Sequence, residues 1–504
     1  MPQILNVTSE PGIRRDGTQF DGTGHIDGQW VRWQRKRPRK MWGYRSVTTE
    51  LTEISRGLHV HSADGQMYLH SGGVSALQQI KTDRFGVLQQ LTTRTPGAGF
   101  VASADNVWQF DLLRDATSGT QRLIAHAAPS LANIDSTTAT SVFFGDVRGT
   151  ATLGDTGIDV SGGIVCLHPY LIAFGSDGLF KWSVPNKPDD FTNVGSGTAY
   201  VTGGKILVGR RVRGTGSGPA GLLWTQDALV RVAFTTGGTT WNVDELAETS
   251  LMSSRAVVEY DGQFYWPGVD RFYTFSGVQR ELPNDMNFNF FFDNVNMTHR
   301  QKVFGFKNPH WGEVWWCFPF GNATEANHAI IMNLREGTWY DTALPNDGRS
   351  AAAYAQTYPR PFMTGVKLRD SAYTLWQHET GLDEADGSTV QGIRSYYETG
   401  EVSLLASDKP QDGTLKTMRI EPDMIQSGDV VVSVQGRQNF RAPEVPGEEK
   451  VVPEVVSGPS DETVPVREVR RLLRFRFESD QVGGDMQAGA TLAHVDAGDK
   501  RIQS

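Results

Sequence analysis

Few residues in this 504-residue sequence have types and spacing that could carry out chemistry. Glu313 lies close to Trp315 and Trp316, and a carboxylate flanked by indole rings could serve a site that cleaves sugars. His59 and His61 have the spacing that places two side chains on one face of a strand, but no third metal ligand accompanies them. Solvation of strand faces explains such acids equally well, and no hydrolase, metalloprotease or nucleotide-binding motif occurs. We therefore predict that the protein is not an enzyme and holds neither a metal nor a cofactor.

The most unusual segment is both basic and aromatic, and it covers residues 28–47. Nucleic-acid phosphates favour such basic side chains, because binding them releases counterions. Alternatively, the segment forms a hairpin whose aromatic side chains pack inward while its basic tip reaches an acidic neighbour. The net charge of −9 favours a contact between subunits, although the same residues could line a path for DNA. The candidate contact residues are Arg32, Arg35, Lys36, Arg37, Arg39, Lys40 and Arg45, and Trp30, Trp33, Trp42 and Tyr44 lie among them.

The elements that would position these residues are short strands joined by tight turns. A turn followed by an alternating aromatic strand recurs along the chain, because Asp-Gly and Asp-Asn pairs readily adopt hairpin conformations. The copies begin at Asp64, Asp105, Asp177, Asp227, Asp261, Gly312 and Asp370, and most gaps between them are 34 to 58 residues. This is about the size of a four-stranded propeller blade, so we predict a mainly β protein with a β-propeller of about seven blades. The long gap from Asp105 to Asp177 holds either an inserted hairpin or an eighth unit, and a meandering β-sandwich is the alternative fold.

The composition agrees with a β protein that is neither disulfide-linked nor membrane-spanning. The 55 glycines lack a three-residue period and fit many tight turns. Cys166 and Cys317 both lie in apolar strand-like runs, so we expect two buried free thiols. The N-terminus lacks the apolar region of a signal peptide, and no run approaches about 18 apolar residues. We therefore expect the protein to fold in a cytoplasm, without stable insertion into a membrane.

The sequence changes in character near residue 390. Four segments there (395–405, 414–425, 429–437 and 470–480) read as strands of a smaller antiparallel sandwich-like domain. In the last of them, Leu473, Phe475 and Phe477 alternate with Arg474, Arg476 and Glu478, which predicts one buried and one polar face. Residues 441–466 are rich in Pro and Glu and are predicted to form an extended loop. The expected organisation is an N-terminal hairpin and assembly segment (1–50), a propeller (51–388) and a C-terminal β domain (389–504).

Both ends of the chain resemble structural proteins from the tails of bacteriophages. The first stretch is DGTQFDGTGHIDGQWVRWQRKRPRKMWGYR, and the others are MRIEPDMIQSGDVVVSVQGR and RRLLRFRFESDQVGGDMQAGATLAHVDAGDKR. Lys36 stands where the glycine of the family's Gly-Arg-Pro motif is usual, which could alter that turn. The middle of the chain agrees only in its blade-like texture.

The resemblance implies a virion protein, the nozzle (tail tube) protein of a short-tailed phage. Such a protein would form a hexameric ring that extends the DNA-ejection channel below the adaptor and portal proteins. Its expected partners are other copies of itself, adaptor and portal-complex proteins, tail fibres or a tail needle, and viral DNA in transit. A receptor-binding or glycan-degrading tail propeller is the alternative, with Trp315 and Trp316 as candidate sugar-stacking residues.

Overall fold

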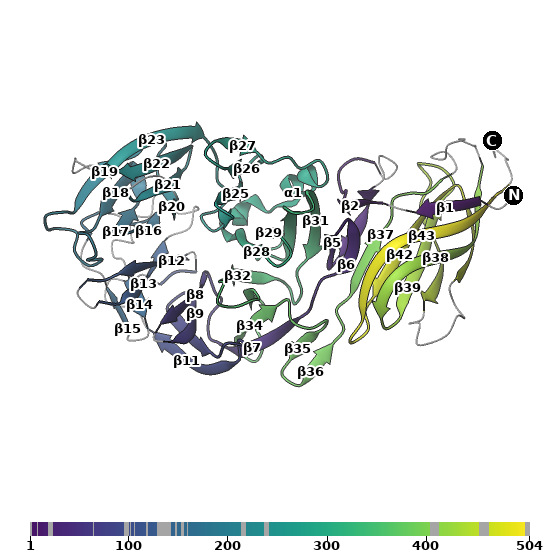
Figure 1. Cartoon of the computed structure of the whole chain (residues 1–504), viewed down its shortest axis with the longest axis horizontal. Helices are drawn as coiled ribbons and strands as arrows, with labels where there is room; N and C mark the ends of the chain where they lie inside the picture. Colours follow the sequence, from purple (N-terminus) through teal and green to yellow (C-terminus); the bar gives the residue numbers. More distant parts are fainter. Residues whose placement is uncertain are drawn as a thin grey trace.

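The protein is elongated, and nearly all of its regular structure is β-strand (Figure 1). A computed structural model describes residues 3–7, 9–18, 24–63, 65–94, 100, 102–104, 106–116, 119–128, 143–146, 149–152, 156–158, 160–212, 218–235, 241–403, 413–452 and 463–498. Within these residues the helical segments are short: η2 (Ser176–Gly178), α1 (Phe288–Asn294) and η3 (Met297–Lys302). The prediction of a mainly β protein is therefore confirmed.

Seven sheets follow one another along most of the chain, and all but the seventh are antiparallel throughout (Figure 1). The first contains β8 (Leu58–Ala63), β9 (Gln66–Gly72), β10 (Leu77–Thr82) and β11 (Leu88–Arg94). The second contains β12 (Val107–Arg114), β13 (Gln121–Ala128), β14 (Phe143–Asp146) and β15 (Gly149–Thr152). The third contains β16 (Gly163–Leu167), β17 (Tyr170–Phe174), β18 (Leu179–Trp182) and β19 (Gly197–Tyr200). The fourth contains β20 (Ile206–Arg211), β21 (Ala220–Thr225), β22 (Ala228–Phe234) and β23 (Trp241–Glu248).

The fifth and sixth sheets keep the same order, in which each strand pairs with the next one along the chain. The fifth contains β24 (Val258–Tyr260), β25 (Gln263–Pro267), β26 (Phe272–Phe275) and β27 (Gln279–Glu281). The sixth contains β28 (Phe304–Asn308), β29 (Glu313–Phe318), β30 (His328–Asn333) and β31 (Thr338–Ala343). The seventh differs, because a strand from near the N-terminus pairs with its third strand. It contains β32 (Arg349–Ala353), β33 (Phe362–Gly365), β34 (Tyr373–His378), β7 (Tyr44–Leu51), β35 (Glu384–Asp386) and β36 (Thr389–Gln391).

Each sheet packs against its neighbour through a cluster of buried hydrophobic side chains. The seventh sheet also packs against the first, since Phe362 and Leu375 share a cluster with Leu58 and Val60. Strand β32 lies against β8 at this contact. Burying both faces of each sheet in this way removes a large apolar area from water, which is the main source of stability.

The predicted turns account for the uneven spacing of the repeat. Asp177 and Gly178 have φ values of 58° and 70° between β17 and β18, whereas Asp261 and Gly262 have 50° and 80° between β24 and β25. The turn motif therefore falls between the second and third strands of one sheet and between the first and second strands of another. The long gap before Asp177 is occupied by β14 and β15, which belong to the second sheet rather than to an additional unit. Asp64 and Asp105 lie outside the described residues.

Two further antiparallel sheets lie at the C-terminal end (Figure 1). One contains β41 (Val464–Arg470), β38 (Leu415–Ser427), β43 (Asp485–Ala497), β6 (Arg37–Lys40) and β5 (Val31–Gln34), with β1 (Gln3–Val7) paired to β43. The other contains β4 (Asp27–Gln29), β37 (Ser395–Glu398), β42 (Leu472–Ser479), β39 (Val430–Arg437) and β40 (Val445–Val452). Both contribute to one buried cluster, and Leu473, Phe475 and Phe477 face it as predicted.

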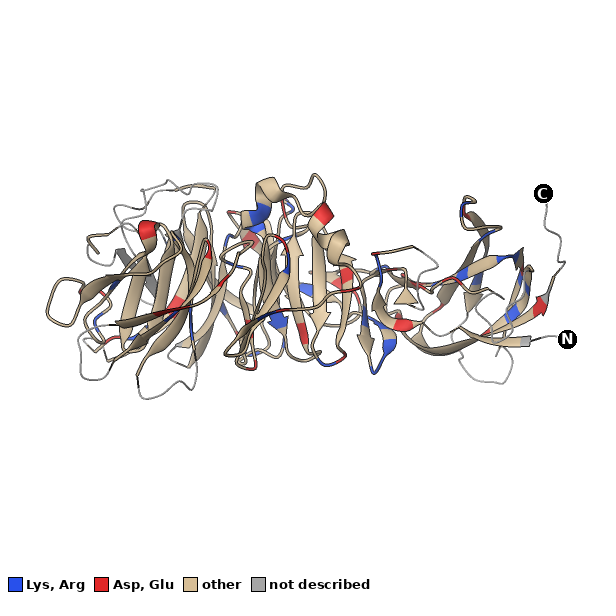
Figure 2. Ribbon diagram, turned by 90° about the horizontal axis from the view of Figure 1, so that it is seen from above, with Lys and Arg blue, Asp and Glu red and all other residues tan. Residues whose placement is uncertain are grey.

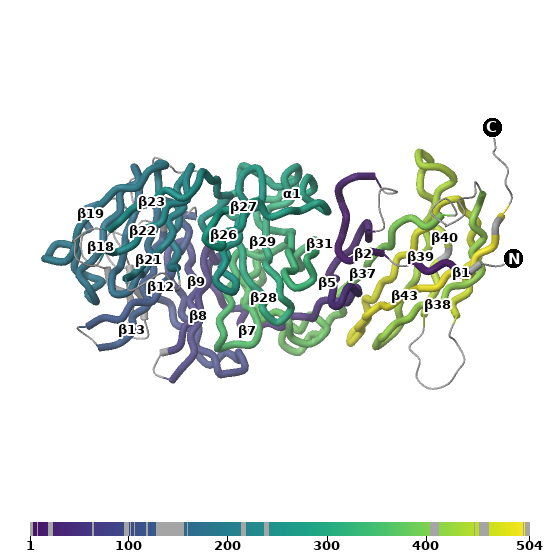
Figure 3. Tube along the Cα trace, turned by 45° about the horizontal axis from the view of Figure 1, so that its top comes forward, coloured from purple at the N-terminus to yellow at the C-terminus, as the bar shows by residue number. Residues whose placement is uncertain are grey.

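The N-terminal residues do not form the separate segment predicted for 1–50. Strands β1, β5 and β6 join one C-terminal sheet, β4 joins the other, and β7 completes the seventh sheet. Strands β2 (Glu10–Ile13) and β3 (Gly24–His25) form a small parallel pair. Figure 3 shows β2 and β5 between β31 and the C-terminal strands, and β1 among those strands. The predicted boundary at residue 50 therefore does not separate two structural units, because these strands pair with distant segments. Local sequence does not encode such pairing.

The Pro- and Glu-rich segment is also different from the prediction of a loop over 441–466. Strand β40 lies within it and pairs with β39, and Pro446 and Pro465 both lie in strands at sheet edges. Proline lacks an N–H to donate, so an edge strand tolerates it. Residues 453–462 lie outside the described part of the chain. Cys166 and Cys317 are buried free thiols, as predicted.

Candidate assembly site at the N-terminal hairpin

The basic segment forms a hairpin of β5 and β6, in which Gln34 pairs with Arg37. Arg35 and Lys36 form its two-residue turn, with φ values of 52° and 61°. Two consecutive left-handed residues match the twist of a hairpin, and glycine adopts this conformation at least cost. Lys36 therefore occupies the position where the resemblance expects glycine, and it keeps the left-handed backbone there.

A carboxylate from the sixth sheet holds this turn. Glu336, which lies between β30 and β31, accepts the amide of Arg35 through Oε1 at 2.8 Å and that of Lys36 through Oε2 at 3.0 Å. Both amides point out of the hairpin, where no strand partner can satisfy them. The turn is thereby fastened to a residue about 300 positions away.

Arg32 is buried at the centre of a charged cluster. Its Nη1 donates to Glu379 Oε2 at 2.9 Å, Nη2 donates to the other oxygen of Glu379, and Nε lies 3.1 Å from Glu313. Burial opposes the charged guanidinium, but the two carboxylates outweigh it and raise the pKa of Arg32. With none of its surface exposed, Arg32 contacts neither DNA nor another subunit. The prediction for this residue is corrected: its partners are two acids of its own chain.

Both acids of this cluster, Glu313 and Glu379, accept further hydrogen bonds from aromatic side chains. Glu313 accepts hydrogen bonds from Tyr340 Oη at 2.6 Å and from Trp315 Nε1 at 2.8 Å. Trp311 Nε1 donates to Glu379 at 2.9 Å. Burial raises the pKa of Glu313, and the guanidinium of Arg32 opposes that rise. A buried ion cluster of this kind is strongly destabilised when one partner is removed.

Lys40 is the second predicted contact residue that has no exposed surface. Its Nζ has no hydrogen-bond partner among the described residues, although Asp383, Asp485 and Asp480 lie near enough to act on it electrostatically. Burial lowers the pKa of Lys40, and the three carboxylates oppose this effect. Lys40 is therefore also removed from the predicted outer contact, because β6 is an inner strand of its sheet.

Arg39 and Arg45 are partly exposed and contact other parts of the same chain. Arg39 donates to Gln34 at 3.2 Å, and its guanidinium lies 5.4 Å from the ring centre of Trp311. Arg45 donates to Gln377 at 2.9 Å and also bonds the carbonyl of Phe85. Figure 2 shows that basic and acidic residues are interspersed along the protein, which favours such internal pairing.

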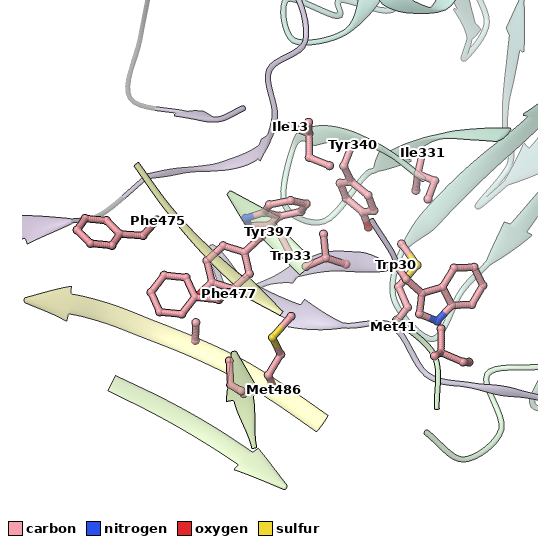
Figure 4. Packing of buried hydrophobic residues seen from close by; sticks show 14 of the residues in the cluster. Ile13, Trp30, Trp33, Met41, Ile331, Tyr340, Tyr397, Phe475, Phe477 and Met486 are labelled. Atoms are coloured by element: carbon pink, nitrogen blue, oxygen red, sulfur yellow. The ribbon is translucent and has the colours of Figure 1, made fainter. Parts of the chain in front are cut away.

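Three of the seven predicted contact residues are exposed: Arg35, Lys36 and Arg37. They form the tip of the hairpin, whereas the aromatic residues beside them pack inward. Trp30, Trp33 and Tyr44 are buried, and Trp42 is half-buried. Figure 4 shows Trp30 and Trp33 in one core with residues of the sixth sheet and of the C-terminal strands. The predicted hairpin with inward aromatics and a basic tip is therefore present.

The residues considered for sugar chemistry are buried. Glu313 and Trp316 have no exposed surface, and Trp315 has 3 %. Their polar atoms are committed to internal hydrogen bonds, so none of the three can reach a glycan.

The structure brings a third histidine to His59 and His61. His70 lies opposite His59 in the β8–β9 ladder, and its ring centre is 5.0 Å from that of His61. The rings of His59 and His61 lie nearly parallel, and those of His61 and His70 are tilted by 34°, so the three do not converge on one point. Among the described residues, no group of His, Cys, Asp and Glu has the arrangement that holds a metal.

The residues that sequence reasoning missed are the acids that fasten the hairpin, Glu336 and Glu379. Nothing in their local sequence distinguishes them from solvated surface acids, and Glu313 was noted only for its tryptophan neighbours. Across known proteins, no family model matches the chain and no curated protein matches its sequence. Within the described residues, no helix is both long and apolar enough to cross a lipid bilayer.

Proposed function

We propose that the chain is a structural protein of a bacteriophage tail, and that it builds the nozzle of a short-tailed phage as a homohexameric ring. The ring extends the DNA-ejection channel below the adaptor and portal proteins and carries tail fibres or a needle. The protein acts by assembly rather than by catalysis, and its place is the virion tail.

The proposal includes a fold, a β-propeller of seven blades. Seven consecutive sheets with a seventh-to-first contact support it. Strand β7 supports it further, because a ring of blades is stabilised when a strand from one end of the chain completes the blade at the other end.

One observation carries the functional proposal. Residues of the N-terminal stretch that bears the resemblance also connect the seven sheets to the two C-terminal sheets, a contact that we call the join. Trp30, Arg32, Trp33 and Tyr44 are buried between the sixth and seventh sheets and the C-terminal strands. Lys36, at the position of the family's glycine, has a left-handed backbone, which glycine adopts at least cost. A tail protein needs such a join, because a ring subunit must transmit load between its two parts without bending.

The basic tip is the proposed contact between subunits. Arg35, Lys36 and Arg37 are exposed at a turn whose backbone is fixed by Glu336, so their charges are presented in a defined place. A neighbouring copy with net charge −9 offers complementary acids. The alternative function, a glycan-binding or glycan-degrading propeller, has lost its candidate residues Glu313, Trp315 and Trp316 to burial.

The test is the oligomeric state of the purified chain, alone and with its adaptor, measured by mass photometry and electron microscopy. We expect particles of six times 55.6 kDa with a six-fold ring. The variant Arg35→Glu, Lys36→Glu, Arg37→Glu should fold but assemble poorly. The matched control is Arg280→Glu, Lys367→Glu, Lys416→Glu, which makes the same charge change at exposed positions elsewhere. A monomer under both conditions, or one to three copies per virion, would overturn the ring; equal assembly of both variants would remove the tip from the contact.

A further inference from the structure

A cavity of about 270 Å³ lies where the first strands of several sheets approach one another. Its lining comes from five of the seven sheets and from the segment before β24, and it includes His59 of β8, Gln109 of β12, Arg210 of β20, Arg255 before β24, Gly305 of β28 and Ala351 of β32. The volume is just below the range for drug-sized ligands, which is about 300–1,000 Å³. The cavity therefore has room for a small ligand.

The polar side-chain groups of this cavity that lack hydrogen-bond partners among the described residues are N–H donors. Arg255 donates Nη1 to the Ser350 carbonyl at 2.8 Å and Nη2 to the Lys302 carbonyl at 3.1 Å, but its Nε has no acceptor among the described residues. The one hydrogen bond that the Arg210 side chain makes in the described structure is to the Gly209 carbonyl at 3.3 Å. His59 Nε2 is also buried without a partner in that part of the chain.

The acceptors nearby are already committed. Gln109 donates its amide to the Gly162 carbonyl at 2.9 Å and accepts the Ile164 amide at 3.2 Å. Asp111 accepts the backbone amides of Leu112 and Cys166, each at 2.8 Å. Glu325 forms ion pairs with Arg56 and Lys302. None of these acids forms an ion pair with Arg210 or Arg255 in the described structure, although Asp111 acts electrostatically on Arg210 and Glu325 on Arg255.

Burial disfavours the charged form of both guanidinium groups. Burial lowers the pKa of Arg255 to about 9, with a further contribution from Arg56, and Glu325 opposes this effect only in part. Burial also lowers the pKa of Arg210, against the opposing effect of Asp111. A buried cation without a partner carries a desolvation cost, which an anion placed beside it would relieve. The carbonyl bonds of Arg255 fix its orientation, because they tie it to residues that precede β28 and lie on β32. Its position is thus set before any ligand arrives.

We propose that this cavity is a binding site for a small oxyanion, either a free phosphate or the phosphate or carboxylate group of a small ligand. Arg210 and Arg255 supply the positive charge, and His59 donates a hydrogen bond from Nε2–H. The cavity is too small for a nucleic-acid strand to pass, so the site takes one anionic group rather than a DNA backbone. This site does not depend on the proposed function, since it rests only on the sheets that enclose it.

The test is isothermal titration calorimetry of the full chain with inorganic phosphate and with citrate, at constant ionic strength. We expect saturable binding of at least one anion near one site per chain. Phosphate alone would define a phosphate site, citrate alone a carboxylate site, and each result supports the proposal. Arg210→Gln should weaken binding about tenfold or more, because it removes charged hydrogen bonds.

The matched control is Arg280→Gln on the exposed strand β27, which should bind like the wild type. Arg255→Gln provides a second test, and its fold is verified by circular dichroism because Arg255 also links three sheets. Arg210→Gln keeps the proposal falsifiable if Arg255→Gln does not fold. Absence of saturable binding by both anions, or equal affinity in wild type and Arg210→Gln, would overturn the site.

Discussion

Arg32 and Glu379 form a two-armed ion pair although they are separated by 347 positions in the chain. The Arg32 guanidinium has no exposed surface, and its central carbon lies 4.5 Å from the ring centre of Trp311. This pair connects the N-terminal hairpin to the end of β34 in the seventh sheet, and Glu313 extends the connection to the sixth. The join between the two parts of the protein therefore contains a buried ion cluster beside its hydrophobic core.

Replacing that cation should destabilise the protein strongly. Arg32→Met leaves Glu313 and Glu379 buried without a counterion, so we expect a loss of about 3–5 kcal/mol in the free energy of unfolding. Urea unfolding followed by tryptophan fluorescence measures it. The control is Arg394→Met, which removes the more exposed partner of Glu478 and should cost at most about 1 kcal/mol. Similar losses in the two variants would contradict a special role for Arg32.

The hairpin turn should become more stable with glycine. Lys36→Gly relieves a left-handed backbone that costs a side-chain residue about 1–2 kcal/mol, and part of this gain is lost to chain entropy. We expect a net gain of about 0.5–1 kcal/mol. Lys416→Gly in strand β38, where the backbone is extended, should instead lose about 0.5–1 kcal/mol. Thermal unfolding compares the two, and a loss at position 36 would refute the strain argument.

Glu336 should protect two backbone amides from exchange. Glu336→Gln removes the negative charge and one of the two oxygens that accept hydrogen bonds from the Arg35 and Lys36 amides. Hydrogen exchange at these two amides should therefore accelerate. The cost in stability should be about 1 kcal/mol. Glu50→Gln, at an exposed position of β7, is the control and should leave both exchange rates unchanged. Unaltered protection in Glu336→Gln would mean that the carboxylate does not hold the turn.

Acid should destabilise the join through His25. Its ring lies 5.1 Å from that of Trp33 and 5.5 Å from that of Tyr397, and burial lowers its pKa to about 4, against the effect of its bond to the Glu10 carbonyl. The unfolded chain titrates near pH 6.5 and therefore takes up a proton that the folded state refuses. The contribution of His25 to the free energy of unfolding is therefore fully present above pH 6.5. It decreases by about 3 kcal/mol in total as the pH falls towards about 4.

His25→Phe removes this proton uptake and should flatten the decline in that window. Urea unfolding at neutral pH and near the folded pKa of about 4 measures the difference for wild type and variant. The change in the free energy of unfolding with pH is the quantity compared, because the substitution also alters packing around the ring. An equally steep decline in His25→Phe would show that other groups cause the acid sensitivity.

Local features of the fold were predictable because they depend on near neighbours in the chain. The alternation of Leu473, Phe475 and Phe477 with polar residues has a period of two, which fixes which face of β42 is buried. The tight turns at Asp177 and Asp261 follow from the tolerance of Asp-Gly for left-handed backbone. The inward aromatics and basic tip of the hairpin follow from residue type in the same way.

Distant partners were not predictable by such means. Pairing of β7 with β34 joins segments more than 300 residues apart, and no local pattern encodes it. The strand at Val445–Val452 was predicted as loop because its prolines are unfavourable in central strands, whereas the structure places it at an edge.

The sequence by itself determined the mainly β class, the hairpin and the set of basic residues in it, since composition, period and turn chemistry are local properties. Only the tertiary structure decided what those basic residues do. Arg32 and Lys40 are buried and Arg35, Lys36 and Arg37 are exposed, although all five are equally basic in the sequence. The physical reason is that burial of a charge depends on acids brought from elsewhere, and Glu313, Glu336 and Glu379 reach the hairpin only when the sheets assemble around it.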